Sequence, residues 1–276
     1  MAKQHTVGRS HDAGGATQPR KPPVTLGRML PAIKHALRRM VGRVVSVVVA
    51  TATDAYYRRI YYSPRWHPRD ELMRRALDRT VDYIESDMGD AIIRNDAFDV
   101  LTYALGQTGV DGLHLEFGVR TGSTINHIAR RRRRATVWGF DSFEGLPENW
   151  SGYTLAAGAF REQPIPDVEP NVELVVGWFD DTLPAFLDDH DDPVAFVHVD
   201  SDIYSSAKTV LTNVGPRLRV GSVIVFNEYF NYPNWEQHEF RAWQEFCAEH
   251  DVRYEYLCWA LYEVAVRITS IGEVSD

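Results

Sequence analysis

Four oxygen-bearing side chains follow two apolar runs of the sequence in a pattern that could bind a cation. Asp200 and Asp202 come directly after one run, and Asn227 and Glu228 come directly after the next. If both runs are parallel strands, the four side chains meet at one edge of the sheet, and period-two alternation puts both aspartates on one side of a continuing strand. Hard cations such as Mg²⁺ select oxygen ligands. For either pair alone, polar residues that merely end a strand remain the ordinary alternative.

A second set of candidate residues lies in the segment Leu113–Ala129, which predicts a strand, a tight turn and the start of a helix. Gly118 and Gly122 bracket the turn, and Glu116 adds a carboxylate at the strand end. Ser123, or the threonine after it, can cap the helix. Backbone N–H groups at such a turn point above the strand ends, where open α/β sheets bind nucleotide-like ligands. An ordinary turn of any α/β protein stays open as the alternative.

Asp141 ends the next expected strand, about 25 residues past the glycine turn, where nucleoside-binding α/β folds place an acidic residue. A carboxylate suits this position because it can accept hydrogen bonds from both ribose hydroxyls. Residues 148–170 follow without clear periodicity and predict a loop or lid. The aromatic residues there and in 230–238 could stack on an acceptor or form lid core; they are Trp150, Tyr153, Phe160, Tyr232 and Trp235.

The periodicity of the chain predicts the elements that position these residues. Apolar runs predict five helix-linked strands within residues 113–119, 135–147, 171–179, 193–204 and 221–230. A helix over 238–250 and a hairpin formed by YEYLCW and YEVAVRI follow. The predicted fold class is therefore α/β, a doubly wound, seven-stranded, mostly parallel sheet with a C-terminal antiparallel hairpin.

The N-terminal part predicts an extension of this domain. Residues 1–23 are polar and rich in Gly and Pro, which predicts a disordered tail. Residues 24–108 predict a helical extension, with two helical pieces in 25–62, and residues 109–276 form the predicted domain. A basic amphipathic helix can dock onto the domain, pair with a second subunit in a homo-oligomer, or make peripheral contact with an anionic membrane. The sequence leaves these partners open.

Charge and cysteine content narrow the class of protein. Residues 1–70 hold 13 Lys and Arg against three Asp and Glu, whereas residues 71–276 hold 17 against 35. The acidic body argues against nucleic acid as a partner. Two cysteines, Cys247 and Cys258, cannot form a disulfide framework, which suits a cytoplasmic location. The apolar run Val44–Ala52 is shorter than a membrane span, so we expect no transmembrane helix.

Five strings between Asp111 and Ile268 resemble the macrocin O-methyltransferase family: EFGVRTGST, GFDSFEGLP, GWFDDTLP, FVHVDSDIYSSAKTVL and VIVFNEYFNYPNWEQHEFRAW. The resemblance implies the class I methyltransferase fold, the cofactor S-adenosylmethionine (SAM) and metal-assisted O-methylation. The acceptor it implies is the hydroxyl of a sugar or of a glycosylated small molecule. A metal lowers the pKa of a bound hydroxyl and a carboxylate takes the proton, which agrees with the residue types above.

The same resemblance assigns roles to individual residues. It places the cofactor site at Glu116, Gly118, Ser123, Asp141 and Ser142. It implies that Asp200 is a catalytic metal ligand and Asp202 the catalytic general base, with Asn227 and Glu228 as further ligands. The chain departs from the family at Asn227, where Asp is usual. Because Asn removes one negative charge, we expect weak Mg²⁺ binding.

Two other classes of function compete with this interpretation. A non-catalytic binding protein of the same fold is supported by Asn227 alone. A nucleotide-dependent oxidoreductase would share the sheet and the ribose-binding acid. The turn is EFGVRTGS rather than G-x-G-x-x-G, however, and Glu116 would repel a pyrophosphate.

Overall fold

The computed structural model describes residues 26–61, 67–161 and 164–272, so the predicted disordered tail lies outside the described residues. The chain divides into two units, Met1–Ser63 and Pro64–Asp276. Three elements that lie within the predicted N-terminal extension, residues 24–108, belong to the second unit. They are α2 (Pro68–Asp87), β1 (Ile92–Ile93) and α3 (Ala97–Leu105).

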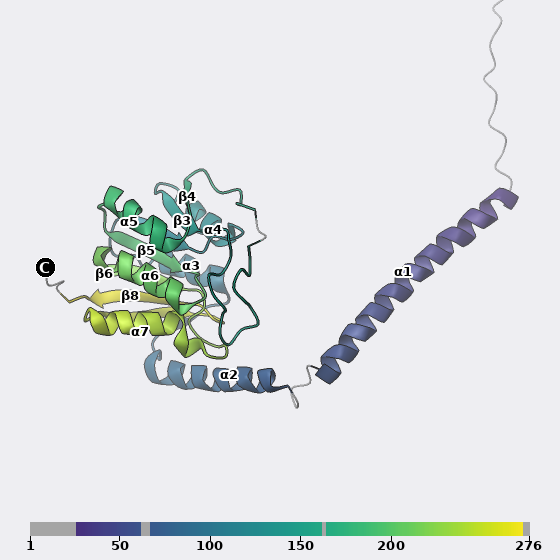
Figure 1. Ribbon diagram of the computed structural model, residues 1–276, viewed down its shortest axis with the longest axis horizontal. Helices are drawn as coiled ribbons and strands as arrows, with labels where there is room; N and C mark the ends of the chain where they lie inside the picture. Colours follow the sequence, from purple (N-terminus) through teal and green to yellow (C-terminus); the bar gives the residue numbers. More distant parts are fainter. Residues whose placement is uncertain (1–25, 62–66, 162–163, 273–276) are drawn as a thin grey trace, which may run out of the picture. The chain divides into compact units, whose positions relative to one another are not determined.

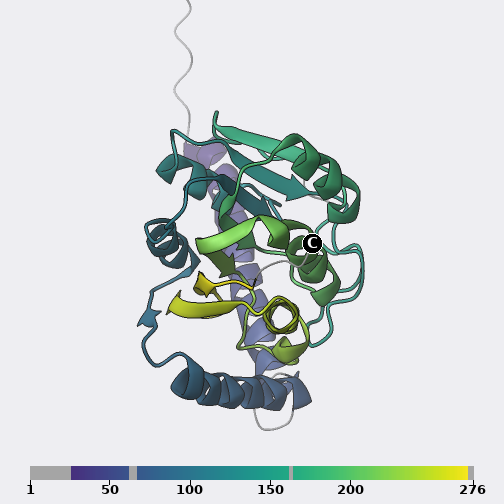
Figure 2. The same cartoon turned by 90° about the vertical axis from the view of Figure 1, so that its left-hand side faces the viewer.

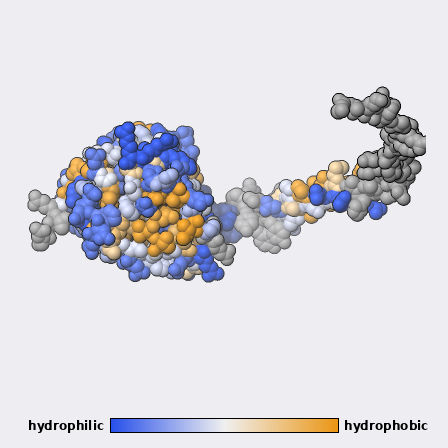
Figure 3. All heavy atoms as spheres, turned by 90° about the horizontal axis from the view of Figure 1, so that it is seen from above, coloured by the Kyte–Doolittle hydropathy of each residue, from blue (hydrophilic) through white to orange (hydrophobic). Residues whose placement is uncertain are grey.

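The first unit contains α1 (Leu26–Tyr61), one helix of 36 residues where two pieces were predicted. Gly42 does not end it, because a glycine inside a helix costs only about 1 kcal/mol relative to alanine. Apolar side chains such as Val44 and Val47 are exposed, and Figure 3 shows hydrophobic and hydrophilic residues side by side along the helix. Among the described residues, no helix combines the length and apolar character needed to cross a membrane.

The second unit is built on a mixed sheet of eight strands (Figure 1). In spatial order they are β1, β7 (Arg253–Trp259), β8 (Val264–Ser270), β6 (Leu218–Phe226), β5 (Val194–Val199), β2 (Leu113–Phe117), β3 (Val137–Asp141) and β4 (Val172–Val176). Only β8 runs antiparallel to its neighbours. The predicted mostly parallel fold with a terminal hairpin is therefore confirmed. The strand number was wrong, because two-residue β1 adds an eighth strand beside β7.

Helices cover both faces of the sheet (Figure 2). One core cluster joins α3 and α4 (Ser123–Arg131) to one face. The other cluster joins the opposite face to α2 and to three further helices, which are α5 (Phe179–Asp189), α6 (Tyr204–Val214) and α7 (Glu239–Glu249). Short 3₁₀ turns, η1 (Gly215–Arg217) and η2 (Trp235–Gln237), precede β6 and α7. This two-faced arrangement explains why the central strands β2 and β5 are buried along their whole length and mostly apolar, with His114, Glu116 and His198 as the polar exceptions.

Alternation along β6 shows how the two clusters share one strand. Ile224 and Phe226 belong to the α5–α7 side, while Val223 and Val225 belong to the α3–α4 side, and all four are fully buried. Each such side chain stabilises the fold by about 1.5–3 kcal/mol. The polar residues that follow Phe226 therefore emerge at the carboxyl edge of the sheet, together with those that follow β2, β3 and β5.

Candidate active site

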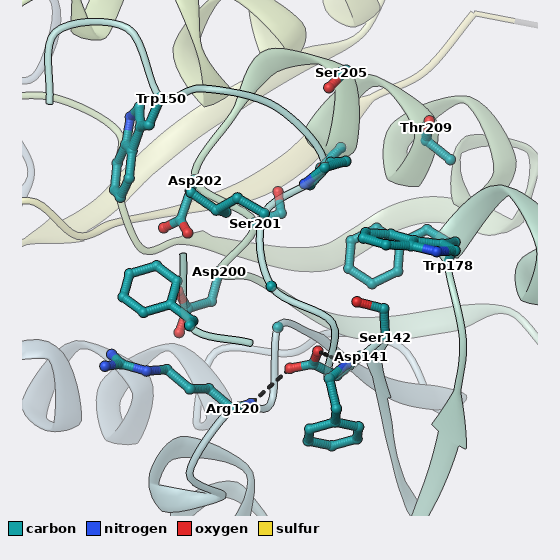
Figure 4. A pocket seen from close by; sticks show the side chains of 18 of the residues that line it. Arg120, Asp141, Ser142, Trp150, Trp178, Asp200, Ser201, Asp202, Ser205 and Thr209 are labelled. Atoms are coloured by element: carbon teal, nitrogen blue, oxygen red, sulfur yellow. Dashed lines mark hydrogen bonds between the residues drawn. The ribbon is translucent and has the colours of Figure 1, made fainter. Parts of the chain in front are cut away.

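A cavity of about 610 Å³ lies at the carboxyl ends of β2, β3, β5 and β6 (Figure 4). Seven of the residues predicted for the cofactor, metal or catalytic roles line it: Gly118, Asp141, Ser142, Asp200, Asp202, Asn227 and Glu228. In Figure 4, Asp141 and Ser142 lie on one side of the cavity, and Asp200 and Asp202 lie on the other. The cavity therefore has a nucleoside-type half and an acidic half.

Gly118 allows the two halves to meet. Its φ is +97°, and a Cβ built there would lie 1.8 Å from the carbonyl oxygen of Asp200. Only glycine tolerates both the left-handed backbone and this approach. On the neighbouring side, the N–H of Gly118 donates to Phe140 O at 2.9 Å. The turn after β2 is thus held directly against the ends of β3 and β5.

Asp141 is fixed by backbone donors of the turn. Its Oδ2 accepts from the N–H of Val119 at 2.9 Å and of Arg120 at 2.7 Å. Its Oδ1 accepts from the N–H of Phe143 at 2.7 Å. A carboxylate offers about four lone-pair sites, so acceptor capacity remains for a ligand hydroxyl in the cavity. The residue expected at the ribose position is present and rigidly held.

Two residues assigned to the cofactor site lie outside the cavity wall. Glu116 is completely buried; its carboxylate accepts from Thr124 Oγ1 at 2.9 Å and lies 3.0 Å from His198 Nδ1. Ser123 is exposed, with its hydroxyl 2.9 Å from Thr121 Oγ1. Glu116 turns into the sheet because His198 faces it from β5. Ser123 does not cap α4 either, since left-handed Gly122 is the N-cap.

The acidic half gathers three carboxylates. Oxygens of Asp200, Asp202 and Glu228 lie within 4.8 Å of one another. The strand alternation predicted for the aspartates was wrong, because β5 ends at Val199 and Asp202 takes a left-handed φ of +66°. The loop, and not the pleat of a strand, therefore brings the two side chains together.

Asn227 joins this cluster through its amide nitrogen. Its Nδ2 donates to Glu228 Oε1 at 2.8 Å and lies 3.3 Å from Asp200 Oδ1. The predicted ligand was the side-chain oxygen, which in this arrangement faces away from the carboxylates. Because the amide is planar, a half-turn about its terminal bond exchanges oxygen and nitrogen. Asn227 can then present the oxygen to a cation without moving the backbone.

The electrostatics of the acidic half are unbalanced. Desolvation raises the pKa of Asp200 to about 7. Desolvation and the charge of Asp200 raise the pKa values of Asp202 and Glu228 well above their usual range. Arg120 is the cationic side chain among the residues that line the cavity. Within the described part of the chain, no group donates to the buried Glu228 Oε2. An oxygen-rich site with such an orphaned atom fits a hard cation.

His198 stands behind this cluster. Burial alone would lower its pKa, but the hydrogen bond to Glu116 and the carboxylate charges around it raise the pKa above its usual value. Both side chains of the His198–Glu116 pair are fully buried. The pair therefore supports the cavity from inside the sheet and does not face a ligand.

Glu239, the first residue of α7, was not among the residues predicted from the sequence. Its carboxylate is fully buried and accepts from the N–H groups of Ser201 at 3.1 Å, Asp202 at 3.3 Å and Glu228 at 3.0 Å. Acidic residues are common in the first turn of any helix because they complement its dipole. No local signal therefore distinguishes this glutamate from an ordinary one.

Aromatic side chains form the wall next to the acidic half. The rings of Trp150 and Tyr153 stack with centroids 4.3 Å apart, and both line the cavity. Phe160 also lines it, with the Arg120 guanidinium 4.3 Å above its ring. Tyr232, by contrast, is fully buried, and its ring centroid lies 5.8 Å from that of Trp150. Trp235 is also buried, so these two residues support the wall without lining the cavity.

Residues 115–229 match the family model described as a methyltransferase domain. This part of the chain is therefore similar to methyltransferase domains. It is 31% identical over 121 residues to demethyldecarbamoylnovobiocin O-methyltransferase of Streptomyces niveus, covering 37% of this chain and 44% of that protein. A second relative is 8-demethyl-8-(2,3-dimethoxy-alpha-L-rhamnosyl)-tetracenomycin-C 4'-O-methyltransferase of Streptomyces olivaceus. It is 31% identical over 144 residues, which cover 44% of this chain and 54% of that protein. The chain thus spans about half the length of these curated relatives.

The calicheamicin methyltransferase CalS11 is similar in fold. The two structures superpose with a TM-score of 0.50 at 24% sequence identity, over 62% of this chain and 77% of that one. This likeness confirms the class I methyltransferase fold that the resemblance implied.

Proposed function

We propose that this protein is a SAM-dependent O-methyltransferase that methylates a hydroxyl of a sugar or glycosylated small molecule, assisted by a divalent cation. One observation carries the proposal: a single cavity joins a nucleoside-type turn to a cluster of carboxylates. The first half suits the cofactor, and the second suits the activation of a hydroxyl. The proposal includes a relationship to the macrocin O-methyltransferases, which the five quoted strings support.

The cofactor is proposed to lie between Gly118 and Asp141. The free acceptor capacity of Asp141 suits the ribose hydroxyls, and Ser142 beside it lines the same half of the cavity. The sulfonium of SAM is positively charged, so the neighbouring carboxylates attract it and would repel an anionic cofactor. The acidic cavity therefore supports SAM over the dinucleotide of an oxidoreductase.

Asp200, Glu228 and the flipped amide of Asn227 would hold the cation. When bound, a divalent cation lowers the pKa of a hydroxyl that it coordinates. Asp202 accepts the hydroxyl proton; an O–CH₃ bond then forms as the S–CH₃ bond of SAM breaks, which leaves S-adenosylhomocysteine.

The aromatic wall supports a sugar as the acceptor. Trp150 and Tyr153 line the cavity as a stacked pair, in which Trp150 is buried and Tyr153 is 40% exposed. The exposed ring of Tyr153 offers a flat apolar face that can stack on the C–H side of a sugar ring while the hydroxyls reach polar groups. The names of both curated relatives refer to O-methylation, and one names a rhamnosyl group. The cytoplasmic location, the membrane contact and the homo-oligomer remain predictions.

A methyl-transfer assay tests the proposal. The purified chain is incubated with methyl-labelled SAM, Mg²⁺ and a panel of rhamnosides, other deoxysugar glycosides and their aglycones. We expect label on a sugar hydroxyl and none on the aglycones. SAM binding measured by calorimetry checks the cofactor independently of the acceptor. Absence of SAM binding would contradict the proposal.

Asn227 supports a second candidate, a non-catalytic protein of the same fold. Its amide N–H groups partly neutralise Asp200 and Glu228, which reduces the attraction for a cation. This candidate predicts SAM binding without turnover, and without Mn²⁺ binding by electron paramagnetic resonance. The two candidates therefore differ in cation binding before any acceptor is known.

A further inference from the structure

The buried carboxylate at the start of α7 contacts both loops that carry the acidic cluster. We propose that Glu239 is a positioning residue that locks the loops after β5 and β6 in the arrangement that binds a divalent cation and the acceptor hydroxyl. This inference rests on the proposed function, since it assigns Glu239 a part in the same site. Neither the resemblance nor the sequence pattern singled out this residue.

The two carboxylate oxygens of Glu239 accept hydrogen bonds from two different loops. Oε1 accepts from Ser201 N at 3.1 Å and from Asp202 N at 3.3 Å, both in the loop after β5. Oε2 accepts from Glu228 N at 3.0 Å, in the loop after β6. One side chain thus joins the two loops whose carboxylates form the cluster. At this edge the loops also meet through the backbone bond from Asn227 N to Val199 O at 2.8 Å and through Asn227 Nδ2, which lies 3.3 Å from Asp200 Oδ1.

Its position also explains how Asp202 holds its conformation. The residue has a φ of +66°, which costs a non-glycine residue of order 1–3 kcal/mol unless the surroundings hold it. The hydrogen bond from Asp202 N to Glu239 lies at this strained residue. Because the backbone turn sets the direction of the side chain, losing this bond would let the proposed base swing away from Asp200.

Glu239 is distinct from the proposed ligands. Its two oxygens are both engaged by backbone N–H groups, and it is outside the set of Asp200, Asp202 and Glu228 whose oxygens could share one ion. A fourth buried carboxylate beside three others is electrostatically unfavourable. Its three charge-assisted hydrogen bonds offset that cost only while the loops keep this arrangement. Acting through backbone groups, it supports ligand geometry in the way that outer residues support metal sites.

The test compares Glu239→Gln and Glu239→Ala with the control Glu249→Gln. Glu249 lies at the other end of the same helix, is exposed and pairs with Lys208 at 2.9 Å. Gln is nearly isosteric but replaces one acceptor oxygen by a donor that cannot face a backbone N–H. Amide hydrogen exchange of Ser201, Asp202 and Glu228, Mn²⁺ affinity by electron paramagnetic resonance and SAM affinity by calorimetry are measured on the full chain.

We expect Glu239→Ala to exchange all three amides faster by about tenfold, the equivalent of one lost hydrogen bond each, and Glu239→Gln to do so at the amides that faced the replaced oxygen, while other amides of β5 and β6 stay unchanged. Mn²⁺ affinity should fall by about 10- to 100-fold, with SAM affinity unchanged. The Mg²⁺ concentration for half-maximal turnover should rise by a similar factor. The control should match the wild type in every readout.

Unchanged exchange at the three amides, or unchanged Mn²⁺ affinity in both variants, would overturn the inference. If Glu239→Ala does not fold, the isosteric Gln variant decides. If the wild type binds Mn²⁺ and the variants lose it, but no acceptor is methylated and SAM is not bound, the proposed function fails while the role of Glu239 stands. The two proposals therefore fail in different measurements.

Discussion

The two halves of the cavity differ in how many hydrogen-bond donors the protein provides to their carboxylates. Asp141 receives three backbone N–H donors from the turns next to it, so its carboxylate is held in one place. Asp200, Asp202 and Glu228 instead face one another, and Glu228 Oε2 receives no donor among the described residues. The nucleoside-type half is therefore preformed, whereas the acidic half requires a positive charge to complete it.

Both halves nevertheless use the same physical device. A carboxylate collects N–H groups from neighbouring turns, Asp141 at the turn after β2 and Glu239 between the loops after β5 and β6. Asp141 faces the cavity in the nucleoside-type half, whereas Glu239 is buried behind the acidic half. The loops of the acidic half thus take their support from Glu239 of α7, and under the proposed function their own carboxylates hold the ligand.

The largest effect is expected from removing a carboxylate of the acidic half. Asp200→Ala should reduce turnover by at least about a hundredfold, because hydroxyl activation is lost. SAM binding, measured by calorimetry, should remain, since Asp141 and the glycine turn are untouched. Asp180→Ala, which changes an exposed acidic residue on the cavity rim, is the control and should keep most activity. Loss of SAM binding in Asp200→Ala would mean that the halves do not act separately.

Cation removal tests the same half without a mutation. Turnover should fall on EDTA treatment and return with Mg²⁺.

The variant Asn227→Asp should increase the affinity for Mg²⁺ by about tenfold, because a carboxylate replaces a neutral amide among the ligands. The measurement is the Mg²⁺ concentration for half-maximal turnover. If turnover is indifferent to EDTA and also survives Asp200→Ala, the metal assignment is wrong.

A smaller effect is expected in the nucleoside-type half. Asp141→Ala should weaken SAM binding by about 1–3 kcal/mol, the cost of leaving hydroxyls or turn N–H groups unpaired. Mn²⁺ affinity should not change, because the residue is not part of the acidic cluster. Calorimetry with SAM measures the effect. Equal SAM affinity in the variant and the wild type would remove Asp141 from the ribose site.

The smallest effect is expected on the stability of the fold, at a residue that lies away from the cavity. Burial lowers the pKa of His114 to about 4, well below its usual 6.5, and the residue is 7% exposed. The unfolded chain takes up the proton first, so the free energy of unfolding falls as pH drops through this window. The loss is about 1 kcal/mol between pH 7 and pH 5.5. Denaturant unfolding measures it, and the uncharged variant His114→Gln should lose less over the same interval.

Local patterns of the sequence predicted much of the domain. Period-two and 3.6-residue patterns predicted the central strands and their helices, because burial on both faces leaves a strong apolar signal. Asp141 was predictable because strand ends of this fold meet at one edge. The meeting of Asp200 with Glu228 followed from the same rule, since β5 and β6 are adjacent and parallel.

Only the tertiary structure decided how the side chains are directed at that edge. Glu116 turns into the sheet because His198 stands beside it, 82 residues along the chain. Glu239 contacts Ser201 across 38 residues and Glu228 across 11, so no local pattern contained its role. Hydrogen bonds between distant segments form only once the sheet has brought its strand ends together. For this protein, sequence alone indicated most of the predicted site residues that reach the cavity, and packing decided which of them line it.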